Sequence, residues 1–130
     1  MKRWTVATIV VACGLFAFAV SRGVYEATSP TSLAWHVALR KTYSIVAFGL
    51  IAYCLYHALG EYGVAGGRAF ATCVVGLAAF SAAVEIGQVF AGSTEGLGWN
   101  AFDVACGGAG GALGGAVAAA TRRTRGSPPR

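Results

Sequence analysis

Charged residues are scarce in this chain. Asp, Glu, Lys and Arg make up 12% of its 130 residues, whereas 56% are hydrophobic, and the mean hydropathy is +0.62. Soluble globular domains carry about 25% charged residues. The shortage of charge therefore excludes an ordinary soluble domain and indicates a membrane protein. The length predicts one domain.

Four runs contain no charged side chain at all. They cover residues 4–21, 42–60, 69–84 and 104–121, and the third continues beyond Glu85 to about residue 91. An α-helix needs roughly 20 apolar residues to cross a hydrocarbon core. We predict transmembrane helices at residues 4–21, 42–60, 69–91 and 103–121. They form one domain over residues 1–121, and a basic cytoplasmic tail follows over residues 122–130.

Alternation of apolar and polar residues is missing from these runs. Strands of membrane barrels alternate over about ten residues, and the runs here are apolar on every face. The chain also lacks an internal repeat and the paired, broken helices that are typical of secondary transporters. The sequence therefore predicts an all-α membrane protein, a four-transmembrane-helix bundle, and argues against a transporter.

Closely spaced cysteines are absent as well. One cysteine stands in each apolar run, at Cys13, Cys54, Cys73 and Cys106. This spacing excludes the common zinc and redox motifs, so we interpret all four as small buried apolar side chains. We predict neither a metal nor a cofactor.

Basic residues outnumber acidic ones by ten to five, and the formal net charge is +5. They stand beside the ends of the predicted helices, so the sequence predicts no nucleic-acid partner. With a cytoplasmic N-terminus, seven basic residues lie inside, and Arg22, Arg40 and Lys41 lie outside. The excess of basic residues on the cytoplasmic side favours this orientation. We predict a multi-pass protein of the plasma (inner) membrane with both termini cytoplasmic.

The first run has an alternative interpretation. Lys2 and Arg3 followed by an apolar run resemble a secretory signal, and residues 17–19 match the small-residue cleavage pattern. Cleavage there leaves three helices and an external N-terminus. Because the run continues to Val20, beyond the usual core length of a signal, we favour a retained first helix.

A few polar residues converge on the predicted outer end. Glu85 and Gln88 are three residues apart and share one helix face. A charge facing lipid is costly, so this face is expected to contact protein or water. The same end receives four other predicted polar groups, and the candidate pocket consists of Glu85, Gln88, Asp103, His36, Arg40 and Asn100.

Each of these residues also has a structural interpretation. Glu85 and Gln88 would then hold helices together, Asp103 would cap the start of the fourth helix, and His36 would lie at the membrane interface. For a functional pocket, we predict that His36 or Arg40 approaches Glu85, with Asp103 on the opposite wall.

The fourth predicted helix is rich in glycine. Two rows have a spacing of four residues, and they comprise Gly107, Gly111 and Gly115 in one row and Gly110 and Gly114 in the other. Small residues at this spacing allow helix backbones to approach closely in a membrane. We predict that this helix is the central one and that the five glycines are packing residues.

The segment Glu85-x-x-Gln88, a short loop, Asp103 and then Gly110 and Gly114 resembles the signature of the VanZ-like family. The similarity covers the last three predicted helices. Members are small multi-helix membrane proteins, named for one associated with low-level resistance to teicoplanin. Two positions differ here: residues 69–121 contain no arginine, whereas the family has one in the loop, and Gly107 replaces an asparagine.

The resemblance implies an envelope protein that binds a membrane lipid or a lipid-linked envelope precursor and affects glycopeptide susceptibility. The alternative is an intramembrane enzyme that acts on a lipid-linked substrate, with Glu85 as acid or base and His36 or Asp103 assisting. The sequence shows no nucleophile–base arrangement or metal motif, and it therefore favours binding over catalysis. It does not indicate an oligomeric state.

Overall fold

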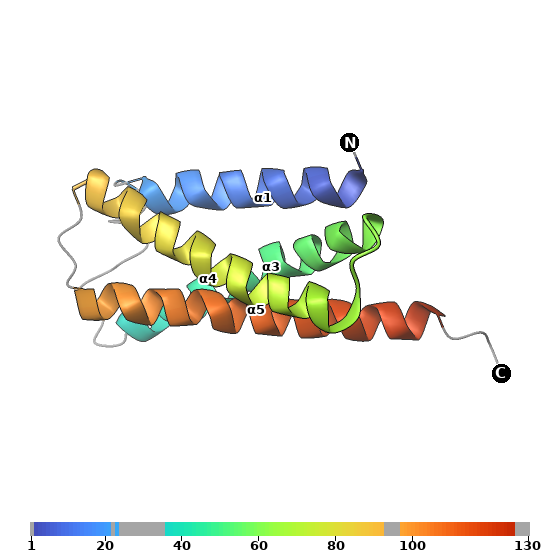
Figure 1. Cartoon of the computed structure of the whole chain (residues 1–130). Helices are drawn as coiled ribbons and strands as arrows, with labels where there is room; N and C mark the ends of the chain where they lie inside the picture. Colours follow the sequence, from blue (N-terminus) through green and yellow to red (C-terminus); the bar gives the residue numbers. More distant parts are fainter. Residues whose placement is uncertain (1, 22, 24–35, 93–96, 127–130) are drawn as a thin grey trace.

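A computed structural model describes residues 2–21, 23, 36–92 and 97–126. This part of the chain is all-helical, with α1 (Arg3–Val20), α3 (His36–Glu61), α4 (Gly66–Phe90) and α5 (Leu97–Gly126). Each of the four is long and apolar enough to cross a membrane. They run alternately up and down, so that α1 begins and α5 ends at the same end of the bundle (Figure 1).

Three helices are longer than the charge-free runs that predicted them. α3 begins at His36 rather than residue 42, and α5 covers Leu97–Gly126 rather than residues 103–121. The predicted helices end at charged residues, but arginine and lysine are good helix formers and continue the helices. The segment predicted as a tail therefore begins as helix, since Arg122 and Arg123 both belong to α5.

A tight turn joins α3 to α4. Gly63 has φ +80°, the Val64 N–H donates to the Leu59 carbonyl at 3.0 Å, and the Gly63 N–H donates to the Gly60 carbonyl at 3.3 Å. This pair of bonds is the Schellman arrangement, in which a glycine with positive φ ends a helix. α3 and α4 consequently form an antiparallel hairpin.

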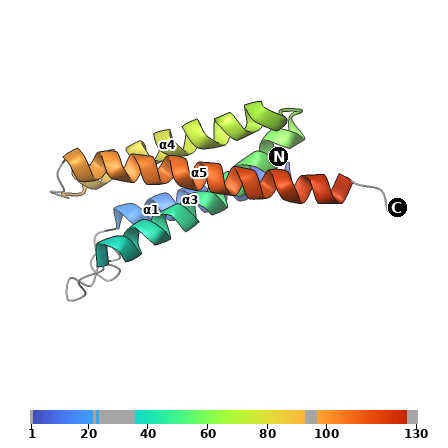
Figure 2. The same cartoon turned by 90° about the horizontal axis from the view of Figure 1, so that it is seen from below.

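α5 lies between α3 and α4, and its two glycine rows face different helices (Figure 2). A Cβ on Gly111 would lie 2.6 Å from the Cys73 carbonyl oxygen of α4, and one on Gly107 would lie 2.8 Å from that of Leu77. On the other face, a Cβ on Gly110 would lie 2.8 Å from the Ile45 carbonyl oxygen of α3. Both neighbouring backbones thus occupy space that a side chain would need.

The buried core lies along these three helices. It comprises Ile51, Ala52, Tyr56, Ala69, Cys73, Leu77 and Ala118. Cys54 and Cys106 are buried as well, and all four cysteines are free. Cys13 is exposed, so the prediction of a buried side chain is wrong there, because α1 packs on one side of the bundle and buries no residue completely.

Both ends of α1 are fastened by polar contacts. At its start, the Trp4 N–H donates to Glu61 Oε1 at 3.4 Å, and the Trp4 ring stacks on His57 with centroids 4.6 Å apart. At its end, Gln88 Nε2 donates to the Ala19 carbonyl at 3.1 Å. α1 is therefore held at its termini while its middle contributes half-buried apolar side chains.

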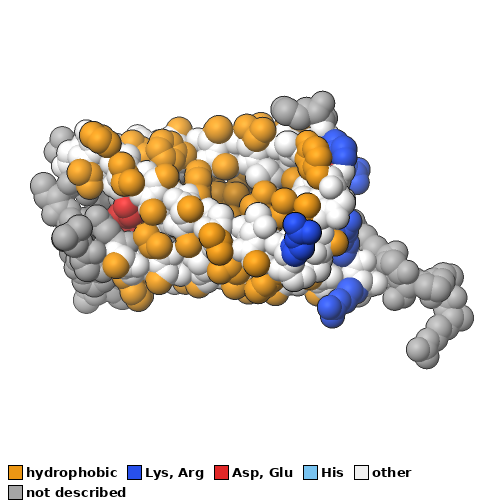
Figure 3. Space-filling model, viewed as in Figure 1, with side chains coloured by type: hydrophobic (Ala, Val, Ile, Leu, Met, Phe, Trp, Pro, Cys, Tyr) orange, Lys and Arg blue, Asp and Glu red, His pale blue; other side chains and the backbone are white. Residues whose placement is uncertain are grey.

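Charge is distributed unequally between the two ends of the bundle (Figure 3). We call the end where α1 begins and α5 ends the basic end, and its described cations are Lys2, Arg3, Arg68, Arg122 and Arg123. At the opposite end, which we call the pocket end, the described charges are Arg40, Lys41, Glu85 and Asp103. On the face shown in Figure 3, most of the coloured side chains between the two ends are apolar.

Candidate binding pocket

A cavity of about 350 Å³ lies toward the pocket end, and all four helices contribute to its wall. Its lining residues are Leu15, Phe18, Ala19, Arg40, Tyr43, Ser44, Ala47, Phe48, Phe80, Ser81, Val84, Glu85, Gln88 and Asp103. The volume is in the range of small-molecule sites. Four of the predicted site residues, Arg40, Glu85, Gln88 and Asp103, therefore line one cavity.

Asp103 is fastened from two sides. Its carboxylate Oδ1 accepts a hydrogen bond from Lys41 Nζ and forms a salt bridge with it, and both side chains are 10% exposed. Its carbonyl accepts a hydrogen bond from Ser81 Oγ at 2.9 Å. The interpretation of Asp103 as a helix cap is wrong, because α5 begins six residues earlier, at Leu97, and the carboxylate is committed to Lys41.

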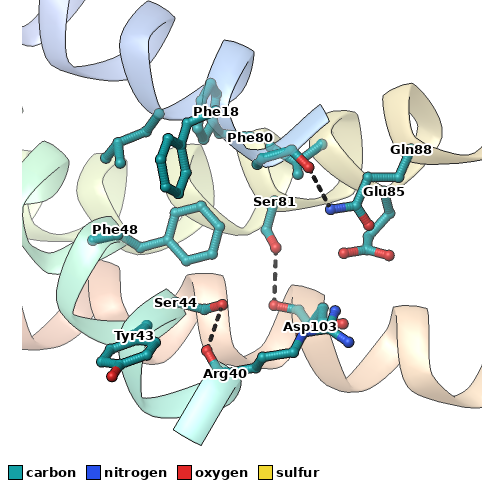
Figure 4. A pocket seen from close by; sticks show the side chains of 14 residues that line it. Phe18, Arg40, Tyr43, Ser44, Phe48, Phe80, Ser81, Glu85, Gln88 and Asp103 are labelled. Atoms are coloured by element: carbon teal, nitrogen blue, oxygen red, sulfur yellow. Dashed lines mark hydrogen bonds between the residues drawn. The ribbon is translucent and has the colours of Figure 1, made fainter. Parts of the chain in front are cut away.

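Glu85 and Gln88 come from the last turns of α4, together with Ser81 one turn earlier. Glu85 is only 9% exposed. Figure 4 shows its carboxylate directed into the space toward which the Arg40 side chain extends from α3. Gln88 donates a hydrogen bond to the Ala19 carbonyl at the end of α1. The face of α4 that lines the cavity therefore also holds α1, which forms another part of the cavity wall.

Aromatic side chains form the other part of the wall. Phe48 and Phe80 meet edge to face, with centroids 6.1 Å apart. Phe48 follows Arg40 by eight residues, which places it about 12 Å further along α3, toward the middle of the bundle. In Figure 4 the aromatic rings and the groups Glu85, Gln88 and Asp103 gather on different sides of the cavity. The cavity is thus apolar in its depth and charged near the end of the bundle.

Two of the lining side chains are exposed at the surface of the bundle. Among the lining residues, Tyr43 of α3 is 56% exposed and Phe18 of α1 is 53% exposed, whereas Ser81, Val84, Glu85 and Asp103 are buried. The exposed rim therefore lies between α1 and α3. A molecule that enters here approaches along the apolar flank of the bundle.

Two predicted site residues have side chains outside the described part of the chain. His36 is the first residue of α3 and Asn100 the fourth of α5, so their backbones belong to the pocket end. The predicted approach of His36 to Glu85 consequently stays a prediction. Arg40 and Glu85 line the same cavity, and the predicted approach of Arg40 to Glu85 stays a prediction as well.

Sequence reasoning missed several residues of the site. Lys41 is not among the predicted pocket residues, although it holds Asp103. Ser81 precedes Glu85 by four residues, and this spacing on one helix face was a usable signal. The ring-bearing residues Tyr43, Phe48 and Phe80 carried no signal, because aromatic residues in an apolar helix are ordinary core residues.

Charged side chains of both signs line the cavity. Arg40 offers a planar set of N–H donors, and Glu85 and Asp103 are carboxylates. Within residues 2–21, 36–92 and 97–126, no three His, Cys, Asp or Glu side chains come together as ligands for a metal ion.

Comparisons of the chain with protein-family models, with curated proteins and with solved structures give no match. The resemblance to the VanZ-like family therefore stays a prediction from the residues themselves.

Proposed function

We propose that the chain is an integral membrane protein that crosses the plasma membrane four times, with both termini in the cytoplasm. The four long apolar helices support insertion. One end of the bundle holds Lys2, Arg3, Arg68, Arg122 and Arg123. This supports the orientation, because basic residues are enriched on the cytoplasmic side. The pocket end then faces the outer leaflet.

In this orientation, the pocket binds an amphipathic envelope lipid or lipid-linked precursor. The observation that carries this proposal is the division of one cavity into an aromatic depth and a charged outer part, with a rim between α1 and α3. A lipid chain fits along Phe48 and Phe80, while its headgroup lies beside Arg40, Glu85 and Asp103. The exposed rim allows such a molecule to enter from the bilayer.

The physiological consequence that we propose follows from the VanZ-like resemblance. A protein that holds an envelope lipid or precursor on the outer side changes its availability to glycopeptides such as teicoplanin. Loss of the pocket is then expected to change susceptibility to these antibiotics.

Catalysis is the second candidate, and the observation in its favour is that two carboxylates, Glu85 and Asp103, line one cavity. In that case Glu85 acts as acid or base on a lipid-linked substrate. The Glu85→Gln variant tests this second candidate. If the protein is an enzyme, the variant still binds the lipid-linked substrate but no longer turns it over.

Filling the cavity tests the binding proposal. Ala47 lines the cavity, whereas Ala109 is exposed on α5 and lies outside it. We expect that the Ala47→Trp variant loses the lipid that copurifies with the wild type in mild detergent, measured by native mass spectrometry. Ala109→Trp, the same change in volume, is expected to retain it.

Circular dichroism and membrane abundance show whether each variant is folded. A folded Ala47→Trp protein that retains the full complement of lipid contradicts the proposal. Absence of any specific lipid from the wild type also contradicts it.

A further inference from the structure

The basic end carries more positive charge than the described chain neutralises. Its five described cations come from the starts of α1 and α4 and the last turns of α5. Among the described residues, one carboxylate accompanies them, that of Glu61, and its Oε1 accepts from the Trp4 N–H. The pocket end, by contrast, has two described cations and two carboxylates. The basic end is therefore the electropositive surface of the molecule.

Arg122 has a specific seat in this surface. Its guanidinium lies directly on the Cα of Gly60, and a Cβ added there would be 2.6 Å from Arg122 Cζ. A Cβ at this point of α3 would make the guanidinium shift, because the guanidinium is the far end of a flexible side chain. The structure describes no hydrogen bond or ion pair of Arg122 with residues 2–21, 36–92 or 97–126, and its side chain is exposed. The guanidinium is thus an exposed cation that lies against Gly60.

Two aromatic side chains lie beside cations of the same surface. Lys2 Nζ lies 4.4 Å from the centroid of the Tyr62 ring, and Arg3 lies 5.9 Å from that of Trp4. Tyrosine and tryptophan prefer the level of lipid headgroups. Cations and aromatic rings therefore occupy the level at which four apolar helices end.

We infer that the basic end binds anionic phospholipid headgroups, with the phosphate held by Arg122 on its Gly60 seat. A guanidinium matches the oxygens of a phosphate in pairs, and basic clusters at helix ends attract anionic lipids. This inference goes beyond the proposed pocket. It rests on the membrane insertion in the proposed function, not on the pocket.

The test uses the full chain purified in a neutral detergent. Dioctanoyl-phosphatidylglycerol is expected to raise its melting temperature, and dioctanoyl-phosphatidylcholine is not. Arg122→Gln is expected to weaken the apparent affinity for the anionic lipid about fivefold, the amount that one basic residue near an anionic surface contributes. Gly60→Ala leaves the charge unchanged but displaces the guanidinium, and a similar loss is expected.

Arg22→Gln is the matched control. It removes the same charge at the position that follows Ser21 in the sequence, and the variant is expected to bind like the wild type. Circular dichroism verifies that each variant is helical. The inference is overturned by equal stabilisation by both lipids, by equal losses in Arg22→Gln and Arg122→Gln, or by an unchanged affinity in folded Gly60→Ala.

A measurement with inorganic phosphate distinguishes a lipid-binding site from a site for a free anion. Stabilisation by phosphate as strong as that by the anionic lipid overturns the inference in favour of a free-anion site. Resistance of the chain to carbonate extraction from membranes tests the proposed insertion separately. A chain that resists extraction but shows no lipid preference contradicts this inference and leaves the proposed function standing.

Discussion

Lys41 of α3 and Asp103 of α5 form a salt bridge across 62 positions of the chain, with both side chains almost completely buried. Each residue lies in the second turn of its helix. The pair therefore joins the two helix starts at the pocket end, beside the cavity that Asp103 lines.

Breaking this pair from one side is expected to destabilise the fold. Lys41→Met leaves a buried carboxylate and Asp103→Leu leaves a buried ammonium, so each costs about 3 kcal/mol. The double variant is expected to lose less than the sum of the two. Thermal unfolding in detergent of the single and double variants measures the coupling, and exposed Arg68→Met serves as the control. Simple additivity would show that the contact does not stabilise the fold.

The glycines of α5 give a second prediction. A Cβ on Gly114 would enter the space of the Gly49 carbonyl oxygen, whereas one on Gly108 would lie 3.9 Å from the Ala78 Cβ, an ordinary contact. Gly114→Ala is therefore expected to cost about 2 kcal/mol through overpacking. Gly108→Ala is expected to be neutral or to stabilise by about 0.5 kcal/mol, because alanine favours helix. The same unfolding measurement checks both, and equal effects at the two positions would refute close backbone packing.

Variants of the pocket charges separate function from folding. Arg40→Gln and Glu85→Gln are expected to keep wild-type abundance in the native membrane and to change teicoplanin susceptibility severalfold. Asp103→Asn is expected to lower abundance, since buried Lys41 loses its charged partner. Immunoblots and growth-inhibition assays are the measurements. If Arg40→Gln and Glu85→Gln both show wild-type susceptibility, these two charges have no part in the proposed function.

The orientation is tested by reporter fusions at Arg130 and Gly96. Activity of a cytoplasmic reporter at Arg130 and of a periplasmic or extracellular reporter at Gly96 is expected, because seven basic residues favour the inner side. Mass determination of the mature N-terminus accompanies the fusions, and a retained first helix is expected. A mature protein that begins near Val20 contradicts the retained helix, and an external Arg130 contradicts the orientation.

The elements and their general order follow from local properties of the sequence. Long charge-free runs satisfy their backbone hydrogen bonds only as helices in an apolar environment, and small residues four apart allow close contact on one face. Helix ends were less predictable, because residues such as Arg40, Lys41 and Arg122 are helical although they interrupt the apolar runs.

Tertiary structure alone determined which residues of different helices contact each other. Arg40 and Lys41 are adjacent, and consecutive residues on a helix point about 100° apart. The rotation of α3 against α5 therefore determines that Lys41 holds Asp103 while Arg40 lines the cavity. In the same way, the spacing of the glycines indicated two faces, but only packing assigned Gly111 to α4 and Gly110 to α3. The cavity itself arises where α1 packs on α3 and α4 without burying any residue completely, a property of fit between helices that no single run encodes.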